Sequence, residues 1–315
     1  MQRQIMDSNP FHRAIFLTGP TASGKTAVGV ELARLIDAEI IALDSKTLFR
    51  GMDIGTAKPT LQERRGIPHH LIDVLEPWET TSVAVYRCWA WNLAQAIEGR
   101  GKRVLFVGGT ALYLKALLRG LFTGPAADPA LRARLESEAE ALGSPSLHAR
   151  LQELDPQSAR RLHPNDRLRL IRALEVLELT GRPLSEHQLE HDRPAPKNCQ
   201  VFALTRGREE LYGRINRRVW AMLEAGWVEE VRALRASPRP PSPVALQTVG
   251  YAEMMELLEG RLSLDATVER IQTRSRRLAK RQMTWFRNLV EIQPVAVDPE
   301  ATPEELAKRL ATLIE

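Results

Sequence analysis

The stretch Gly19-Pro20-Thr21-Ala22-Ser23-Gly24-Lys25-Thr26 has the spacing G-x-x-x-x-G-K-[ST], which is typical of a phosphate-binding loop. The apolar residues 14–17 before it predict a short buried strand, and residues 26–35 after it predict a helix with one apolar face. The glycines let backbone amides approach an oxyanion, and the first turn of the helix adds unpaired N–H groups. Lys25 supplies a positive charge and Thr26 can hold Mg²⁺. The stretch therefore predicts a diphosphate site with Mg²⁺ as cofactor, and a glycine turn at the surface is the alternative.

The chain has 315 residues and a net charge of +5. This length suits one large domain or two linked domains, and the positive charge is compatible with a polyanionic partner. Residues 1–13 contain no apolar run long enough for a signal peptide, and no stretch approaches the roughly 20 apolar residues of a membrane span. We therefore expect a cytoplasmic, monomeric protein without a membrane partner. Cys88 and Cys199 are far apart in the sequence, so we expect two reduced thiols in the core.

Further apolar runs predict four more strands, at residues 39–43, 103–107, 201–204 and 292–297. Because stretches with helical periodicity separate them, the order predicts an α/β fold, a P-loop NTPase-like parallel sheet flanked by helices. In such a sheet the ligand crevice lies beyond the carboxyl ends of the strands. Asp44 directly follows one of these strands, so we expect its carboxylate to face the same crevice as Lys25. A turn or helix-cap aspartate is the alternative.

The strand at residues 103–107 ends in Gly108-Gly109-Thr110. An ordinary P-loop ATPase carries an aspartate here that positions Mg²⁺ and the attacking water. Two glycines and a hydroxyl do not supply that carboxylate. ATP hydrolysis is therefore not expected to be the main activity.

From residue 123 to residue 198 the pattern predicts helices alone, so we expect an all-helical insertion domain. It separates two parts of the core, residues 12–122 and 199–315. Between residues 160 and 172 there are five arginines and one acid, Asp166. A solvated face and a surface for nucleic-acid phosphates both remain open.

The histidine pairs do not predict a metal site. His69 and His70 are adjacent in residues 66–73, which predict a loop, and no third ligand follows at a recognisable spacing. His187 and His191 are spaced i, i+4 without the glutamate of a zinc-protease motif. We expect the first pair to pack or to bond within the loop, and the second pair to lie at the surface.

Residues 265–289 predict a long basic helix on which Arg270, Arg274, Arg277 and Arg281 recur at i, i+4, i+7 and i+11. This spacing places all four charges on one face, where they repel one another. Nucleic-acid phosphates would neutralise such a stripe, and a solvated face is the alternative.

Taken together, these motifs resemble the tRNA dimethylallyltransferase family, also called tRNA isopentenyltransferase, almost from end to end. The matching stretches are Gly19–Thr26, Asp44-Ser45, Arg50–Pro59, Pro68–Asp73, Gly108-Gly109-Thr110 with Leu112-Tyr113, Asn165-Asp166 with Arg169, Arg172–Glu175, Gly250-Tyr251 and Ala279–Arg287. The resemblance implies transfer of a dimethylallyl group from dimethylallyl diphosphate to N6 of adenosine 37 in tRNA. The tRNAs concerned read codons that begin with U, and the anticodon stem-loop is the implied partner.

The residues and the resemblance together give a set of catalytic and binding candidates. The adenine amine is a poor nucleophile, so Asp44 is expected to accept its proton, while Lys25, Thr110 and Arg218 stabilise the departing diphosphate. The resemblance implies Arg218. The expected tRNA contacts are Asp44, Ser45, Lys46, Thr47, Thr110, Arg132, Leu168, Arg169, Arg172, Gln247, Gly250, Tyr251, Arg274, Arg277 and Arg281.

The chain departs from the family pattern after Asp44-Ser45, where Lys46-Thr47-Leu48-Phe49 places Thr47 at the position of a usual glutamine. Either base recognition is then expected to use a different hydrogen bond, or the activity is expected to be altered. Ala111 also replaces a usual glycine, at a position where a helix tolerates a methyl group.

Two other functional classes remain open. A small-molecule kinase would use the loop and Asp44, but it has no need of the arginine stripe or the helical insertion. A nucleic-acid-binding ATPase would explain the stripe but normally carries an acid after the strand at residues 103–107.

Overall fold

The computed structural model describes residues 10–122, 124–191, 194–196 and 199–314, and these residues fold into two compact units. Unit 1 comprises Met1–Leu118 and Ala195–Glu315, and unit 2 comprises Arg119–Pro194. Residues 123–198 were expected to form the insertion. Of the described residues, none belongs to a helix long and apolar enough to cross a membrane.

Unit 1 is built on a six-stranded sheet in which every neighbouring pair of strands is parallel, with the order β3-β2-β4-β1-β5-β6. The strands are β1 (Ile15–Thr18), β2 (Ala38–Ala42), β3 (His69–His70), β4 (Arg103–Val107), β5 (Gln200–Thr205) and β6 (Ile292–Ala296). The expected parallel α/β sheet is thus confirmed. Because β1 lies between β4 and β5, the loop that follows β1 lies between the loops that follow those two strands.

The helices of unit 1 precede, separate and follow these strands. They are η1 (Pro10–His12), α2 (Lys25–Leu35), α3 (Leu61–Arg64), α4 (Val83–Gly99), α5 (Ala111–Arg119), α11 (Arg208–Glu224), α12 (Trp227–Arg235), α13 (Pro243–Leu246), α14 (Tyr251–Leu258), α15 (Leu264–Arg287) and α16 (Pro303–Ala311). Thr302 and Glu305 form a capping box at the start of α16.

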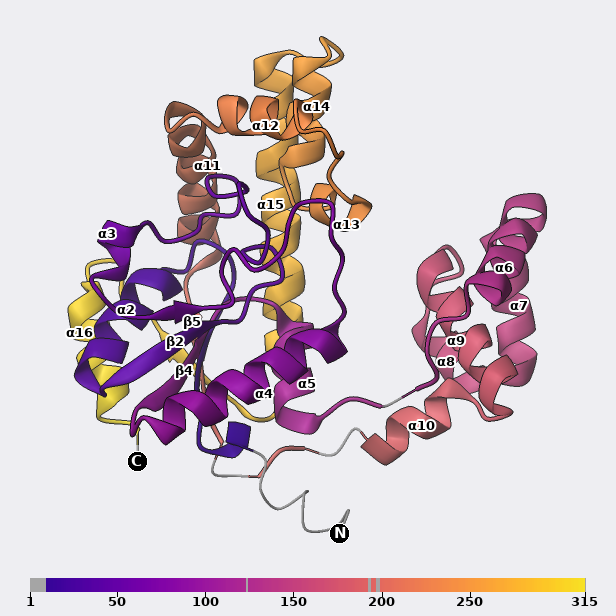
Figure 1. Cartoon of the computed structure of the whole chain (residues 1–315), viewed down its shortest axis with the longest axis horizontal. Helices are drawn as coiled ribbons and strands as arrows, with labels where there is room; N and C mark the ends of the chain where they lie inside the picture. The colour runs from indigo at the N-terminus through magenta and orange to yellow at the C-terminus, as the bar shows by residue number, and fades with distance from the viewer. Residues whose placement is uncertain (1–9, 123, 192–193, 197–198, 315) are drawn as a thin grey trace. The chain divides into compact units, whose positions relative to one another are not determined.

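Alternating side chains of the strands create two separate cores, one on each face of the sheet. Ile15 and Leu17 of β1 pack with α2 and α16, whereas Phe16 packs on the opposite face with α4 and α5. Figure 1 shows α2 and α16 together on one side of the strands and α4 with α5 on the other. The helices therefore cover both faces and leave the carboxyl edge of the sheet for the loops.

One strand was missed in the sequence. Residues 66–73 were expected to be a loop, but His69 and His70 form β3, which pairs with Ile40 and Ile41 at the edge of the sheet. His70 Nε2 lies 2.7 Å from the carboxylate of Glu39, and His69 Nδ1 lies 2.8 Å from the carbonyl of Ile67. A two-residue strand has no measurable period, so only pairing reveals it.

Unit 2 is helical, as expected for the insertion. Its helices are α6 (Pro129–Leu142), α7 (Ser144–Leu154), α8 (Pro156–Arg161), α9 (Arg167–Thr180) and α10 (Leu184–His191). Its core is formed by leucines and small residues of α6 to α9, including the fully buried Leu135, Leu147 and Leu170. Unit 2 thus has a hydrophobic core of its own.

Two predictions about single side chains were wrong. Cys88, expected in the core, is exposed on α4, while Cys199 is buried as expected. His187, expected at the surface, is buried and stacks on Phe122 with a centroid separation of 4.2 Å. The i, i+4 spacing of His187 and His191 does not reveal that residues outside their helix, including Phe122 and Thr180, contact His187.

Candidate active site

The phosphate-binding loop adopts the conformation that its sequence predicts. Gly24 has φ of 99° and ends the loop in the left-handed region, and α2 begins at the next residue, Lys25. This conformation favours glycine because a Cβ atom would strain the backbone. No acidic side chain lies in the first turn of α2, so its positive end is available to an anion.

Lys25 folds back over the loop. Its Nζ donates a hydrogen bond to the carbonyl of Pro20 at 2.8 Å. The pKa of Lys25 is lowered to about 8, mainly by burial; the charge of Asp44 partly opposes this effect, and the charge of Arg218 adds to it. Lys25, Arg218 and Asp44 are therefore close enough to share one electrostatic environment, as the sheet topology predicted for the lysine and the aspartate.

A row of arginines from the end of β5 and from α11 holds the loop from its other side. The Nε of Arg206 donates to the carbonyl of Ser23 at 3.0 Å, and the Nε of Arg214 donates to the carbonyl of Ala22 at 2.8 Å. Arg218 donates to the Thr21 hydroxyl at 3.4 Å. Sequence reasoning identified Arg218 but missed the roles of Arg206 and Arg214. The position of Arg206, directly after a strand of the sheet, was the available signal.

A cavity of about 460 Å³ opens beside the start of α2. Its lining combines the loop with α11 and with residues near α3 and α16, namely Ala22, Gly24, Lys25, Thr26, Ala27, Val30, Glu31, Glu63, Arg65, Arg214, Arg217, Arg218, Pro303 and Glu304. Cations from the loop and from α11 meet in it. It has the volume and the charge to take a phosphorylated small molecule.

Asp44 follows β2 and is fixed by its own loop. Its Oδ1 accepts the N–H of Lys46 at 2.8 Å, and the neighbouring Ser45 N–H donates to the Thr110 hydroxyl at 3.1 Å. Thr110 also donates its N–H to the carbonyl of Leu43 at 3.1 Å. Asp44 and Thr110, both predicted from the ends of strands, therefore belong to two loops that are hydrogen-bonded to each other.

Burial raises the pKa of Asp44, while the N–H of Lys46 and the positive charges of Lys25, Lys46 and Arg218 partly offset that effect. A carboxylate with a raised pKa is a stronger base than a solvated one. The geometry thus gives Asp44 both a fixed orientation and the capacity to accept a proton.

The residues that replace the usual family pattern turn inward. The Thr47 side chain is buried, and its hydroxyl donates to the Asp44 carbonyl at 3.3 Å. The ammonium group of Lys46 donates to the carbonyl of Val244 in α13 at 2.8 Å. In this structure both side chains brace the Asp44 loop, and their contact with a base stays a prediction.

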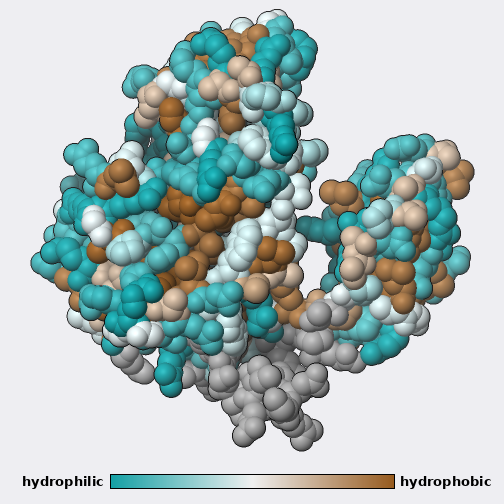
Figure 2. All heavy atoms as spheres, viewed as in Figure 1, coloured by the Kyte–Doolittle hydropathy of each residue, from teal (hydrophilic) through white to brown (hydrophobic). Residues whose placement is uncertain are grey.

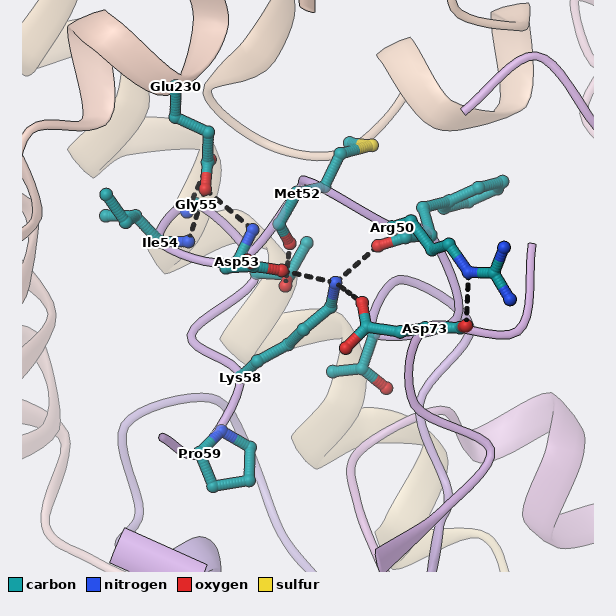
Figure 3. A network of polar contacts seen from close by, with 12 residues as sticks. Arg50, Met52, Asp53, Ile54, Gly55, Lys58, Pro59, Asp73 and Glu230 are labelled. Atoms are coloured by element: carbon teal, nitrogen blue, oxygen red, sulfur yellow. Dashed lines mark hydrogen bonds and ion pairs between the residues drawn. The ribbon is translucent and has the colours of Figure 1, made fainter. Parts of the chain in front are cut away.

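The segment that follows, Gly51 to Pro59, is organised around the buried Lys58 (Figure 3). Its Nζ donates to Asp53 Oδ1 at 2.6 Å, to Asp73 and to the Phe49 carbonyl. Glu230 of α12 accepts the N–H groups of Asp53, Ile54 and Gly55, at 2.6, 2.7 and 3.2 Å. Sequence reasoning recorded the segment but could not foresee these long-range partners.

Two expected tRNA contacts near this network are interior residues. Tyr251 is fully buried and its hydroxyl donates to Glu230 at 2.7 Å, and Gly250 packs against the Trp227 ring. Both residues are buried in this structure, and their contact with tRNA stays a prediction. Gln247 is exposed.

The basic stripe of α15 is only partly unneutralised. Arg270 forms an ion pair of 3.0 Å with Glu256, and Arg274 pairs with Glu253, both from α14. Arg277 and Arg281 are exposed, and no salt bridge to either is found in the described part of the chain. Two of the four charges expected on the stripe are thus paired with acids of the neighbouring helix, which the spacing of one helix does not reveal.

In unit 2, two expected RNA contacts surround a buried acid. The guanidinium of Arg132 binds both oxygens of Glu175 at 2.9 Å, and Arg172 binds the same carboxylate at 2.6 Å. Glu175 is fully buried, and the bonds from Arg132, Arg172 and the Asp128 N–H outweigh its desolvation and lower its pKa to about 2. Both arginines thus bind a buried acid of unit 2, and their expected contact with tRNA stays a prediction.

Leu168 and Arg169 face outward from the start of α9. Leu168 is 72% exposed, and Arg169 makes an ion pair of 3.1 Å with Asp166. An exposed leucine beside an arginine is a surface that a folded RNA could contact. The structure leaves that contact as a prediction.

Apolar surface also lies on unit 1. Figure 2 shows a hydrophobic patch where Figure 1, in the same view, draws the loops between β2 and α4. These loops include the Asp44 segment and the segment organised around Lys58.

The fold and the site define an α/β protein with a phosphate-binding loop, in which a cavity lined by cations opens beside the loop and a buried carboxylate follows a neighbouring strand. The IPP transferase family model matches residues 47–289. The chain is 47% identical over 281 residues to the tRNA dimethylallyltransferase of Geobacter metallireducens, covering 89% of this chain and 91% of that protein. The chain therefore belongs to the IPP transferase family. The curated relatives that it matches are tRNA dimethylallyltransferases.

Solved structures agree with this assignment. The tRNA isopentenylpyrophosphate transferase of Bacillus halodurans has a TM-score of 0.70 and 38% identity, covering 96% of this chain and 97% of that chain. A eukaryotic dimethylallyltransferase acting on tRNA has a TM-score of 0.79 and 28% identity, covering 95% of this chain and 77% of that chain. The resemblance stated from the motifs is thus confirmed.

Proposed function

We propose that this protein transfers a dimethylallyl group from dimethylallyl diphosphate to N6 of adenosine 37 in the anticodon stem-loop of tRNAs that read codons beginning with U. One observation carries the proposal. A diphosphate site made of the loop, Lys25 and Arg218 shares its electrostatic environment with the buried base Asp44. Prenyl transfer needs these two elements side by side, one for the leaving group and one for the nucleophile.

In the proposed reaction the N6 lone pair forms a bond to the first carbon of the allyl group, and the bond from that carbon to the bridging oxygen breaks. Diphosphate leaves with the bonding electrons, and one N6 proton passes to the Asp44 carboxylate. The amine is weakly nucleophilic because its lone pair is conjugated with the ring, so a base within reach lowers the barrier. The raised pKa of Asp44 supports this role.

Negative charge gathers on the diphosphate as the bond breaks. Lys25, Arg218 and the N–H groups at the start of α2 are placed to stabilise it. Thr110, whose hydroxyl is held by the Ser45 N–H at 3.1 Å, can donate its own hydrogen to the bridging oxygen. Since Ser45 donates to Thr110, the hydroxyl hydrogen of Thr110 is left to point toward an acceptor.

Mg²⁺ belongs to the proposal as a cofactor. Thr26 is exposed at the second position of α2 and lines the cavity beside Lys25, so an oxygen donor of the kind that Mg²⁺ prefers faces the diphosphate site. When bound, Mg²⁺ would neutralise charge on the leaving diphosphate. Thr26 is the residue that would hold it, with phosphate oxygens and water completing its ligands.

For tRNA, the proposal uses the exposed Arg277 and Arg281 of α15 and the outward-facing Leu168 and Arg169 of unit 2. Phosphate contacts by arginines fix the orientation of an RNA, and base contacts near Asp44 then select the adenosine. All groups of the proposed chemistry come from a single chain. We accordingly propose a monomer, and light scattering of the protein with and without tRNA tests this oligomeric state. We further propose that the protein works in the cytoplasm.

The experiment that separates this function from the alternatives uses one RNA and two donors. The protein is mixed with Mg²⁺ and an anticodon stem-loop, with either dimethylallyl diphosphate or ATP, and the RNA is weighed by mass spectrometry. The proposal predicts a gain of one dimethylallyl group only with the allylic donor. An unchanged RNA with both donors would contradict the proposal. ATP consumed in the presence of the RNA would then favour the nucleic-acid-binding ATPase, and ATP that is consumed only after a small-molecule acceptor is added would favour the small-molecule kinase.

A further inference from the structure

A single side chain of α15 joins the two loops of the proposed donor site. The Oε1 of Gln282 accepts the N–H of Thr21 at 2.8 Å, and its Nε2 donates to the carbonyl of Gly109 at 2.9 Å. Thr21 lies in the phosphate-binding loop, 261 residues away in sequence, and Gly109 lies 173 residues away, in the loop after β4. The amide group uses both its oxygen and its nitrogen in these bonds. A flip that exchanged the two atoms would therefore lose both bonds.

Each partner of Gln282 is next to a residue of the proposed chemistry. Gly109 precedes Thr110, whose hydroxyl is held by Ser45, the neighbour of Asp44. Thr21 is held a second time through its hydroxyl, which accepts from Arg218 at 3.4 Å. The Gln282 amide is therefore the direct side-chain link between the loop that binds diphosphate and the loop that carries Thr110.

The packing around Gly109 fits the same arrangement. A Cβ atom at residue 109 would lie 2.6 Å from the Nε2 of Gln282, closer than real side chains approach. The glycine therefore leaves the space that the amide occupies. The buried position of Gly109 and the half-buried position of Gln282 keep these bonds partly shielded from water.

We propose that Gln282 is a positioning residue for the transfer reaction: its amide fixes the phosphate-binding loop against the Thr110 loop, so that the diphosphate is held where Thr110 and Asp44 can act. This inference rests on the proposed function for its kinetic consequences. The structural part, a better-formed diphosphate site, can be tested without transfer. Gln282 itself touches neither reactant in this account.

The first test compares two glutamines of the same helix. Gln282→Met removes both bonds with little change of shape, and Gln272→Met is its control, because Gln272 donates to the Asn216 carbonyl at 3.4 Å, outside the donor site. The Kd of inorganic pyrophosphate is measured by calorimetry with Mg²⁺, and the Kd of tRNA by filter binding. Gln282→Met is expected to raise the pyrophosphate Kd about 10-fold, as loss of hydrogen bonds of ordinary strength implies.

The kinetic part of the test measures kcat/KM for dimethylallyl diphosphate, which should fall about 10- to 100-fold in Gln282→Met. The tRNA Kd should stay within about twofold of the wild-type value, and Gln272→Met should match the wild type throughout. A normal pyrophosphate Kd in Gln282→Met, or an equal loss in Gln272→Met, would overturn the proposal. If the wild type transferred no prenyl group, the proposed function would fail while the pyrophosphate comparison still decided the positioning claim.

A second variant provides a signature that general loss of stability would not produce. In Gln282→Glu, one carboxylate oxygen can still accept the Thr21 N–H. The other oxygen faces the Gly109 carbonyl and has no hydrogen to donate to it. Protonation of that carboxyl restores a donor to Gly109, so the rate of Gln282→Glu relative to the wild type should rise as pH falls. Taking the ratio removes the pH dependence of Asp44. If the ratio of the two rates stays constant within measurement error from about pH 5 to about pH 8, the proposal is contradicted.

Discussion

Replacing Asp44 with asparagine tests the proposed base with little disturbance of the fold. The asparagine Oδ1 can still accept the Lys46 N–H, which lies at 2.8 Å from the aspartate oxygen. What Asp44→Asn removes is the capacity to take a proton from the adenine amine. Removing a general base lowers a rate by about 10²- to 10⁴-fold, which is about 3–5 kcal/mol of activation free energy.

The assay is single-turnover transfer to an anticodon stem-loop, with RNA saturating, so that the rate reports the chemical step. Asp37→Asn is the matched control, because Asp37 pairs with Lys102 at the surface, at 2.5 Å, outside the site. Asp44→Asn should lose the stated factor while its Kd for tRNA changes little. Asp37→Asn should react like the wild type.

The pH dependence and the stability of the same variant follow from the raised pKa of Asp44. The wild-type rate should fall as pH drops through that pKa, because the protonated carboxyl cannot act as a base. The folded protein binds this proton more tightly than the unfolded chain, so the ionised carboxylate lowers stability above the folded pKa. Asp44→Asn should therefore lack the acid limb and have a higher Tm at neutral pH. A normal rate in the variant, or lost tRNA binding with an intact chemical step, would refute the assignment of Asp44 as the base.

Three further outcomes are expected. Because the pKa of Lys25 is about 8, pyrophosphate binding at pH 9 should take up a proton, and the affinity should weaken as pH rises above 8. Calorimetry in buffers of different ionisation enthalpy measures this proton uptake, and binding that does not depend on pH would contradict the prediction. Arg277→Ala and Arg281→Ala should each make the slope of log tRNA affinity against log salt shallower by about one unit. Arg270→Ala should change the slope less, because Arg270 is already paired with Glu256. Equal effects of all three variants would argue against an RNA surface on this helix. Glu175→Gln should lower the free energy of unfolding of unit 2 by about 1–3 kcal/mol at pH 7. Because the pKa of Glu175 is lowered to about 2, the stabilisation by its carboxylate is present above the ordinary pKa of 4.5 and is lost as pH falls toward 2. Acid unfolding curves, measured by circular dichroism, that are identical for the variant and the wild type would exclude this role.

The regular elements of the core could be predicted from the sequence because their signals are local. The helix expected at residues 26–35 begins one residue earlier, at Lys25, and the strand expected at residues 103–107 has those limits in the structure. Asp44 and Thr110 were found by one further rule, that ligands bind beyond the carboxyl ends of parallel strands. The two-residue strand β3 was missed because it is too short to show a period.

The remaining contacts of the site depend on partners that are far away in sequence. Nothing local to α15 indicates that Glu253 pairs with Arg274, or that Gln282 binds two loops more than 170 residues away. The same holds for Glu230 and the loop organised around Lys58. Side-chain pairing between elements follows from packing, and the periodicity of a single element does not specify it.

The central claim is that the phosphate-binding loop holds an allylic diphosphate and does not drive nucleotide hydrolysis. The most direct measurement counts products in one reaction that contains the protein, Mg²⁺, an anticodon stem-loop, dimethylallyl diphosphate and ATP. We predict one pyrophosphate released per prenylated RNA, with ATP remaining intact and its omission leaving the transfer undiminished. Steady phosphate release from ATP that tRNA stimulates, or transfer that stops when ATP is omitted, would contradict the claim.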